Sequence, residues 1–327
     1  MNRTARTSLL LLLGACAQDY AITITPEQIK TPENPPELGP TMVHDRLRQR
    51  VPEKVDVLWV IDNSASMLAE QDALAENFDA FLEYYRRSGL DWQIGVVSTD
   101  MWDNTQSGRL QGAAGFLWTD PGVPDPTGVF SQMARLGRDG SAKEQGRRAV
   151  FNALTEPLVS TYNAGFYRPD ALLSVIVVSD EQDFSEEPTI PAFITWLQAL
   201  KPDPSMVDFS AIVGLDDRCT DRVSQDYLDV VTAMNGVAFS ICTDDWTPIL
   251  QQLGIRAAGL QREFFLTEVP AEDSLHVWID DEGVVYEFIQ GTDFTYNGDH
   301  NSINFERYTP RATAFINVEY ATAETAK

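Results

Sequence analysis

The sequence predicts an α/β protein with a doubly wound, mainly parallel six-stranded sheet, followed by a small antiparallel β module. Three observations predict this class. Between residues 55 and 258, apolar segments of strand length alternate with amphipathic segments of helix length. The apolar segments are nearly continuous, as expected when both faces of a parallel sheet are covered. After about residue 262 the segments become short and alternating, and turn sequences separate them.

The strands of the predicted parallel sheet are the apolar segments. We expect them at 55–61, 92–99, 172–179, 207–214 and 237–241, with a short edge hairpin over 109–110 and 115–118 as the sixth member. Helices are expected at 68–87, 143–157, 190–200, 223–234 and 246–258. The Gly- and Pro-rich excursion from about 100 to 140 shows no clear periodicity, and its length suggests a functional or hairpin-bearing loop.

The C-terminal β module is predicted from its turn sequences. Asp280-Asp281-Glu282-Gly283 and Asn297-Gly298-Asp299 are typical hairpin turns between short alternating segments. The strands are expected at 262–267, 275–280, 284–289, 293–297, 302–306 and 312–320. The predicted boundaries are therefore 51–260 for the α/β domain, 261–322 for the module and 323–327 for a tail.

The first sixteen residues have the pattern of a signal peptide. Two arginines precede the apolar run 8–13, which is too short to span a bilayer. Leu13-Gly14-Ala15-Cys16 resembles the lipobox of bacterial lipoproteins. That resemblance implies lipidation of Cys16 and an outer-membrane anchor in a Gram-negative cell, with the periplasmic or surface face left open. The alternative is ordinary secretory cleavage that leaves Cys16 free.

A proline-rich tether is predicted to follow, over residues 17–50. Within it, residues 20–25 have strand character, and residues 22–25 are a candidate additional strand of the β module. With Cys16 lipidated, Cys219 and Cys242 remain as a pair in an oxidising compartment, so a disulfide is expected between them. Two buried free thiols are the alternative.

The net charge limits the partners of this chain. It is −25 for the whole sequence, and removal of the two signal-peptide arginines makes it −27. Such a surface repels nucleic acid and anionic membranes, so we expect no nucleic-acid partner and membrane contact through the lipid alone.

Asp62-Asn63-Ser64-Ala65-Ser66 follows the first buried strand and is the strongest candidate site. Alternate residues of extended backbone point the same way, so Asp62, Ser64 and Ser66 are expected to present oxygen atoms together. One carboxylate and two hydroxyls suit a hard divalent cation, with Mg²⁺ preferred and Mn²⁺ or Ca²⁺ possible. Alternatively, Ser64 or Ser66 is the N-cap of the helix expected near Leu68, and both interpretations can hold together.

A strand followed by D-x-S-x-S resembles the metal-ion-dependent adhesion site of von Willebrand factor type A domains. Together with Glu144-Gln145-Gly146 and Ser179-Asp180-Glu181, it resembles predicted type A lipoproteins of delta-proteobacteria. The resemblance implies that Asp180 holds the ion through water and that a middle loop supplies a hydroxyl. Ser141 is our choice for that ligand and Glu144 is its competitor. A capping box with Ser141 at the helix start and Glu144 three residues later explains the same pair.

The identity of the middle-loop ligand has a functional consequence. With Asp62 as the only directly bound carboxylate, the ion keeps positive charge and accepts a carboxylate from a partner. A directly bound Glu144 neutralises the ion and makes the site more nearly structural. Asp100, which follows Thr99 at the same sheet edge, is a minor candidate. Asp183, in the acidic run after Asp180, is a candidate ligand of a second cation, and a solvated loop is the alternative.

These features predict a cation-dependent adhesion or assembly protein whose partner, a protein or an envelope component, presents a carboxylate. A structural envelope protein with a non-adhesive metal site is one alternative. A Mg²⁺-dependent phosphatase of the haloacid dehalogenase kind is another, but it needs a second carboxylate two residues after Asp62, where Ser64 stands. The three histidines, His44, His276 and His300, belong to no catalytic motif. We therefore predict no enzyme activity.

Overall fold

The structure is a computed structural model that describes residues 41–48, 52–216, 220, 222–271, 273–306, 308–311 and 314–322. Several predicted features lie outside these residues: the signal peptide with Cys16, the candidate strand 22–25, Cys219 and the tail 323–327. In the described part of the chain, no helix has the length and apolar character needed to cross a membrane.

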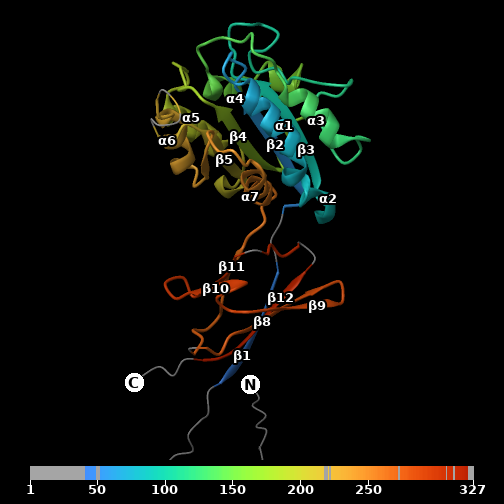
Figure 1. Cartoon of the computed structure of the whole chain (residues 1–327), viewed down its shortest axis with the longest axis vertical. Helices are drawn as coiled ribbons and strands as arrows, with labels where there is room; N and C mark the ends of the chain where they lie inside the picture. The colour runs from blue at the N-terminus through green and yellow to red at the C-terminus, as the bar shows by residue number, and fades with distance from the viewer. Residues whose placement is uncertain are drawn as a thin grey trace, which may run out of the picture. The chain divides into compact units, whose positions relative to one another are not determined.

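A fully parallel sheet forms the centre of the α/β domain (Figure 1). Its strand order is β3-β2-β4-β5-β6. The strands are β2 (Lys54–Ile61), β3 (Asp91–Ser98), β4 (Leu172–Ser179), β5 (Val207–Val213) and β6 (Ala238–Ser240). Almost every residue of β2, β4 and β5 is buried, which explains their continuous apolar sequences.

The predicted count of six strands in this sheet is not confirmed, because the 100–140 excursion forms no named strand. The excursion instead lies antiparallel along the outer side of β3. The amide of Gln111 donates to the carbonyl of Val96 at 2.8 Å, and Ile94 and Thr119 exchange two backbone hydrogen bonds of 2.9 Å. These contacts cover the edge of the sheet without extending it by a regular strand.

Helices cover both faces of the sheet. They are α1 (Leu68–Leu82), α2 (Tyr85–Ser88), α3 (Pro126–Ala134), α4 (Gly146–Ala153), α5 (Ile190–Ala199), α6 (Gln225–Ala233) and α7 (Thr247–Ala257). Side chains of α1, α3 and α7 pack on one face, where Trp59 of β2 contacts Phe78, Phe81 and Phe130. Side chains of α4, α5 and α6 pack on the other face. The sequence predicted one long helix over 68–87, and the structure divides it into α1 and α2.

Helix α3 was not predicted, since it lies inside the excursion. It begins where the side chain of Asp125 accepts a hydrogen bond from the amide of Gly128, with Pro126 in the first turn. An N-cap aspartate followed by proline is a strong local start for a helix. Val129, Phe130 and Met133 then bury the apolar side of this short helix.

The β module consists of two antiparallel sheets with an apolar core between them. The four-stranded sheet has the order β1-β12-β8-β9, and the three-stranded sheet has the order β10-β11-β7. The strands are β1 (Met42–Arg48), β7 (Glu263–Phe265), β8 (His276–Asp281), β9 (Val284–Phe288), β10 (Phe294–Asn297), β11 (Ser302–Phe305) and β12 (Phe315–Ala321). Each of the six segments predicted for this module overlaps one of the strands β7 to β12, and two of the strands, β8 and β12, extend one residue beyond the predicted end.

Strand β1 comes from the segment that we predicted as a tether, and it pairs with β12 along its whole length. The parallel sheet and its helices are therefore inserted between the first and second strands of the module. A segment preceding the α/β domain does join the module, but it is Met42–Arg48 and not the candidate 22–25, which lies outside the described residues.

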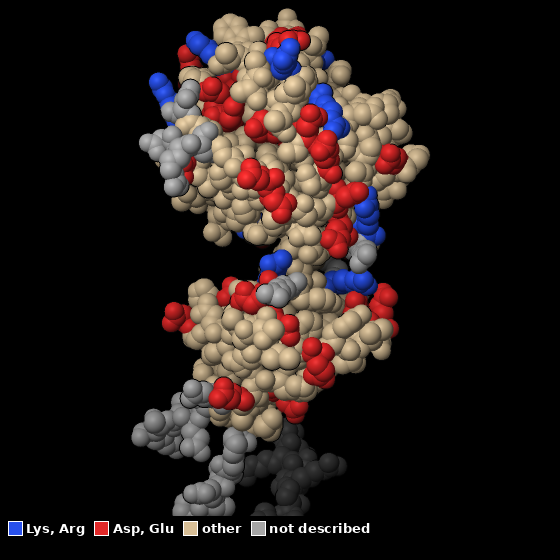
Figure 2. Space-filling model, viewed as in Figure 1, with Lys and Arg blue, Asp and Glu red and all other residues tan. Residues whose placement is uncertain are grey.

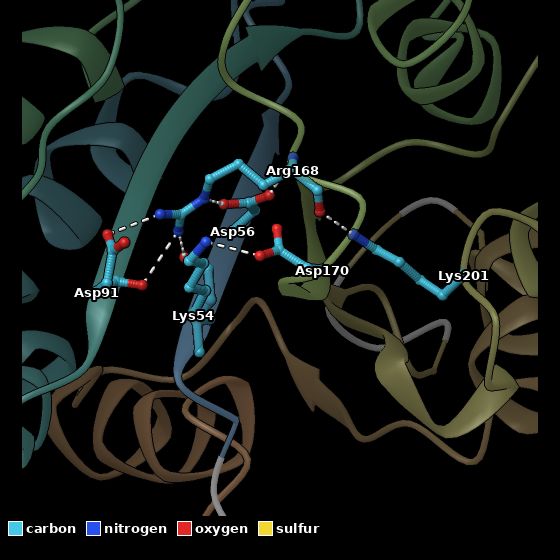
Figure 3. Close-up of polar contacts among 7 residues, drawn as sticks. Lys54, Asp56, Asp91, Arg168, Asp170 and Lys201 are labelled. Atoms are coloured by element: carbon cyan, nitrogen blue, oxygen red, sulfur yellow. Dashed lines mark hydrogen bonds and ion pairs between the residues drawn. The ribbon is translucent and has the colours of Figure 1, made fainter.

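Ion pairs tie together the amino ends of the central strands (Figure 3). The guanidinium group of Arg168 lies between Asp56 of β2 and Asp91 of β3, and its Nε and Nη1 atoms reach their carboxylates at 2.7 and 2.6 Å. The backbone amide of Arg168 donates a further 2.7 Å bond to Asp56. Lys201 donates to the carbonyl of Arg168, which holds the loop before β4 in place.

Candidate functional site

Asp62 lies at the carboxyl end of β2 and is fully buried. Its backbone amide donates to the carbonyl of Val178 in the neighbouring strand β4 at 2.9 Å. One carboxylate oxygen accepts the amide of Ser64 at 2.7 Å, and the other accepts the hydroxyl of Ser179 at 2.6 Å. Only neutral donors therefore hold this carboxylate in position.

Ser64 and Ser66 lie together beside Asp62, with their hydroxyl oxygens 3.2 Å apart. Neither caps α1, because the N-cap residue is Met67 and no side chain bonds to the first turn. The capping interpretation of these two serines is therefore not what the structure adopts, and their oxygens stay at the sheet edge. Ser64 is buried, whereas Ser66 is exposed.

Three hydrogen bonds fix the loop that carries this motif. Gln71 of α1 donates to the carbonyls of Asp62 and Gly137, each at 2.9 Å. The amide of Gly140 donates to the carbonyl of Asn63 at 3.0 Å. A Cβ atom at Gly140 would lie 2.3 Å from the side-chain oxygen of Asn63, so a larger residue here would displace the Asn63 side chain.

The middle loop brings Glu144 into the site. Glu144 is fully buried, and one of its carboxylate oxygens accepts the hydroxyl of Thr99 from the end of β3. The backbone carbonyl of Glu144 accepts the amide of Phe184 at 2.7 Å, which joins this loop to the one after β4.

Ser141 lies in the same loop but faces its own backbone. Its hydroxyl accepts the amide of Lys143 at 3.0 Å, and its amide donates to Asp100 at 3.2 Å. The capping box is not formed, since α4 starts at Gly146 with Gln145 as N-cap and no side-chain cap. Ser141 as a metal ligand stays a prediction, and the burial of Glu144 beside Thr99 favours the competitor.

Asp180 follows β4 at the same edge, and one of its carboxylate oxygens is buried without a hydrogen-bond partner among the described residues. Glu70 in the first turn of α1 has a buried carboxylate oxygen in the same condition, and so does Glu144. Ser179, Gln71 and Glu70 were not predicted as parts of the site. Their position in the site depends on which strands and helices pack together, which the sequence pattern does not give. Only Ser179 had a signal in the sequence, because it directly precedes the predicted Asp180.

The two minor candidates have other partners. Both oxygens of Asp183 are engaged, one by the backbone amide and hydroxyl of Ser185 and the other by the buried guanidinium of Arg147. Asp100 accepts the amides of Trp102 and Ser141 at 2.7 and 3.2 Å. Each carboxylate thus organises a loop beside the site.

The electrostatics of the site are those of crowded like charges. Burial raises the pKa of Asp62 to about 6, and the charge of Asp180 adds to this rise. Burial also raises the pKa of Glu144 to about 9, with the charge of Asp62 as the second cause. The pKa of Glu70 is raised by burial and by the charge of Asp180.

No basic side chain compensates these charges within the described part of the chain. None of its lysines or arginines forms an ion pair with Asp62, Glu70, Glu144 or Asp180. It also contains no group of three or more His, Cys, Asp or Glu side chains arranged to hold a metal. The predicted metal site differs from such a group, because serine hydroxyl oxygens supply several of its ligands. Unpartnered carboxylate oxygens beside hydroxyls match the donors that hard cations prefer.

Large apolar side chains are exposed on the segments that leave the carboxyl ends of four strands. Leu68, Trp102, Phe184 and Leu215 follow β2, β3, β4 and β5, and their exposed fractions are 46%, 70%, 41% and 36%. A groove of about 620 Å³ next to Trp102 is lined by Asp100, Asp103 and Gly140, among others. Exposed aromatic and aliphatic groups around a polar centre are common at protein interaction surfaces.

Cys242, two residues after β6, is disulfide-bonded. Its predicted partner, Cys219, lies outside the described residues, so the pairing of these two cysteines stays a prediction.

No protein-family model and no curated protein matches the sequence. Among solved structures, a von Willebrand factor type A protein from Catenulispora acidiphila is similar at 11% identity with a TM-score of 0.39, over 87% of this chain and 66% of the other. The pilus adhesin SpaC from Lactobacillus rhamnosus GG is similar at 11% identity with a TM-score of 0.45, over 85% of this chain and 40% of the adhesin. Proximal thread matrix protein 1 from the mussel byssus has 14% identity and a TM-score of 0.43, over 68% and 52% of the two chains.

Proposed function

We propose that the carboxyl edge of the parallel sheet binds a divalent cation, with Mg²⁺ preferred and Mn²⁺ or Ca²⁺ as alternatives. The observation that carries the proposal is the set of buried carboxylate oxygens on Glu70, Glu144 and Asp180 that have no hydrogen-bond partner among the described residues, beside the buried Asp62. Like charges in a low-dielectric site repel one another strongly, so a bound cation stabilises all of them together.

The residues present fit such an ion. Asp62 and Glu144 would supply carboxylate oxygens, Ser64 and Ser66 would supply hydroxyl oxygens, and Asp180 would act directly or through water. Mg²⁺ and Ca²⁺ both bind oxygen ligands and keep water in open positions. The bound cation would supply a positive charge that attracts an acidic group.

The partner that we propose is a protein or envelope component with an accessible carboxylate, so the function is cation-dependent adhesion or assembly. The exposed Leu68, Trp102, Phe184 and Leu215 support a partner surface around the cation. The acidic surface in Figure 2 supports cation dependence, because a carboxylate would otherwise be repelled by a chain of net charge −25.

One observation favours a second candidate, a structural cation site in an envelope protein. Glu144 is buried in the middle loop. If it binds the ion directly beside Asp62, the two carboxylates neutralise a divalent charge and weaken the capture of a partner's carboxylate. A pull-down from envelope extract separates the two functions, since adhesion requires partner binding that EDTA abolishes and magnesium restores.

Isothermal titration with MgCl₂ and MnCl₂ tests the cation site. We expect saturable binding to the full chain, loss of binding in Asp62→Ala, and unchanged binding in Asp229→Ala, which alters an exposed aspartate of α6. Equal binding by the wild type and Asp62→Ala would remove the basis of the proposal.

The proposed location is the outer membrane, through a lipid on Cys16, with either face possible. Mass spectrometry of the N-terminal peptide tests it, since acylation of Cys16 adds fatty-acid mass that Cys16→Ser cannot carry. We also propose that the chain is not an enzyme. A screen of phosphoesters at saturating Mg²⁺ checks this, and turnover that disappears in Asp62→Asn would instead support the phosphatase alternative.

A further inference from the structure

The groove next to Trp102 continues directly from the proposed cation site. Its lining residues belong to two segments, 100–103 and 139–143, which form its two walls. Thr99 precedes the first wall in the sequence, and Glu144 follows the second. The hydroxyl of Thr99 donates to the carboxylate of Glu144, so the two walls meet at residues of the site. A molecule bound at the cation can therefore extend into the groove.

The polar lining of this groove is mainly acidic. It contains Asp100, Asp103 and Asp139, and its basic residue is Lys143. Asp103 and Asp139 are exposed, and neither forms an ion pair with a lysine or arginine in the described part of the chain. One oxygen of Asp103 accepts the amide and the hydroxyl of Thr105 at 2.7 and 2.8 Å. The groove thus offers negative charge to a cationic group from outside the chain.

The three carboxylates of the groove have different tasks. Asp100 is 5% exposed and accepts the backbone amides of Trp102 and Ser141 at 2.7 and 3.2 Å, so it holds the two walls together. Asp139 has no comparable bond within the described residues. It is therefore the carboxylate most available to a ligand.

The ring of Trp102 gives the groove a second preference for a cation. This side chain lines the groove and is 70% exposed. Cationic side chains are attracted to the face of an aromatic ring, and tryptophan attracts them most strongly. Among the described residues, the cationic groups that lie over rings occupy Phe315, Tyr162 and Tyr167, and none lies over Trp102.

Asn63 provides a buried acceptor at the wall of the groove. It is 2% exposed, and its side-chain oxygen has no hydrogen-bond partner among the described residues. Its amide group lies against Gly140, which lines the groove, and a Cβ atom there would be 2.3 Å from that oxygen. A buried acceptor without a donor is costly, so this oxygen points to a ligand that brings hydrogen-bond donors.

We propose that the groove binds an arginine side chain of the same partner whose carboxylate binds the cation. This proposal rests on the cation-dependent function proposed above. Arginine has five N–H donors and no acceptor, which complements a groove lined by carboxylate oxygens. Its planar guanidinium group can also stack on Trp102 while its edge pairs with Asp139.

Charge complementarity selects this partner over one that is acidic throughout. A second acidic group beside the captured carboxylate would approach Asp103 and Asp139, which repel it. An arginine in that place is attracted to both. The proposed partner therefore carries an acidic residue and an arginine within a few residues of each other.

Synthetic peptides with blocked ends test this pairing of charges. Each peptide contains one glutamate and one arginine, separated by one, two or three glycines. In the matched control peptide, citrulline replaces arginine and removes the charge while keeping the shape. In MgCl₂, isothermal titration of the full chain should show that the arginine peptide of best spacing binds about fivefold tighter than its citrulline control. In EDTA both peptides should lose their binding.

The outcomes separate this proposal from the cation function. Equal Mg²⁺-dependent binding of the arginine and citrulline peptides at every spacing overturns the arginine groove and leaves the cation function intact. If no peptide binds in a Mg²⁺-dependent way, the capture of a carboxylate is overturned, and the groove proposal fails with it. An arginine preference that persists in EDTA would mean that the groove works independently of the cation, which contradicts the proposed pairing.

Substitutions in the groove test which residues recognise the arginine. The quantity measured is the ratio of the dissociation constants of the citrulline and arginine peptides, so a general loss of binding does not affect it. Asp139→Asn and Trp102→Ala should each lower this ratio, and the double variant should bring it to about one. Asp229→Asn, on α6, is the matched control and should keep the wild-type ratio. An undiminished ratio in the double variant overturns the proposal, and circular dichroism verifies that each variant is folded.

Discussion

Asp56 and Asp62 lie six residues apart at the two ends of β2, and they differ in how their charge is balanced. Both are fully buried, and burial raises the pKa of each to about 6. Asp56 accepts two 2.7 Å hydrogen bonds from Arg168, one of which is also an ion pair. Asp62 accepts hydrogen bonds from Ser64 and from the hydroxyl of Ser179, which are neutral donors.

The neighbours of the two aspartates widen the difference. At the amino end, Arg168 also pairs with Asp91, and Lys54 pairs with Asp170 (Figure 3). At the carboxyl end, the neighbours of Asp62 include Glu144 and Asp180, which are further acidic groups rather than counter-ions. The first end has its counter-ions within the chain. The second end lacks them among the described residues, which is the arrangement expected where a cation from solution completes a site.

The largest expected effect is at the amino end. Arg168→Met leaves Asp56 buried without its counter-ion, and breaking a buried ion pair in this way costs about 3–5 kcal/mol. Urea denaturation should show this loss in the free energy of unfolding. The double variant Asp56→Asn with Arg168→Met should recover part of it, because no unpaired charge remains. A loss for Arg168→Met no greater than that for the exposed Lys54→Ala would contradict the comparison.

The dependence of stability on pH should distinguish the two ends. The pKa of Asp56 and of Asp62 rises from 3.8 to about 6 on folding. The folded chain therefore holds these protons more tightly, and the resulting stability is complete below pH 3.8 and lost as pH rises through 6. Each loss is of the order of 3 kcal/mol. In EDTA, the urea midpoint should fall as the pH rises from 4 to 7. Mg²⁺ should remove only the part of this fall that comes from Asp62. An equal slope with and without Mg²⁺ would argue against a cation at Asp62.

Cation binding should also raise the melting temperature of the wild type. A ligand at a hundred times its dissociation constant stabilises the native state by about 2.7 kcal/mol. Asp62→Asn should abolish this rise and, in EDTA, should melt no lower than the wild type, since it removes one of several repelling charges. Asp229→Ala, on the exposed side of α6, should keep the full Mg²⁺ effect. A Mg²⁺-dependent rise that persists in Asp62→Asn would place the ion elsewhere.

The sequence predicted much of the fold because its apolar segments mark the buried strands. All five parallel strands and all six strands of the module from β7 onward lie where continuous or alternating patterns indicated. Strand β1 was missed because Asp45, Arg46 and Arg48 obscure its alternation, and its pairing with β12 joins residues far apart in sequence. Helix α3 was missed because it is short and depends on a local cap at Asp125.

The predictable residues of the candidate site are those that directly follow the ends of parallel strands. Asp62, Ser64 and Ser66 follow one strand and Asp180 follows its neighbour, so topology alone brings them to one edge. The hydrogen bonds of Ser179 and Gln71 depend on strand register and helix orientation, which sequence patterns do not determine. The counter-ion of Asp56 had no signal at all, since Arg168 is 112 residues away.

The smallest expected effect is a change in Mg²⁺ affinity on substitution of Glu144 or Ser141, and it shows which of these two residues holds the cation. Glu144 is fully buried and has a carboxylate oxygen without a partner in the described part of the chain, whereas the hydroxyl of Ser141 accepts the amide of Lys143. Glu144→Gln should therefore weaken Mg²⁺ binding about tenfold, or about 1.4 kcal/mol, and Ser141→Ala should leave it unchanged. Isothermal titration of both variants measures the difference. Because Glu144→Gln also removes a negative charge, it should strengthen the binding of a partner's carboxylate if the ion is otherwise neutralised. The reverse result, with Ser141→Ala losing affinity and Glu144→Gln retaining it, would assign the hydroxyl ligand to Ser141 and leave the ion with the positive charge that adhesion requires.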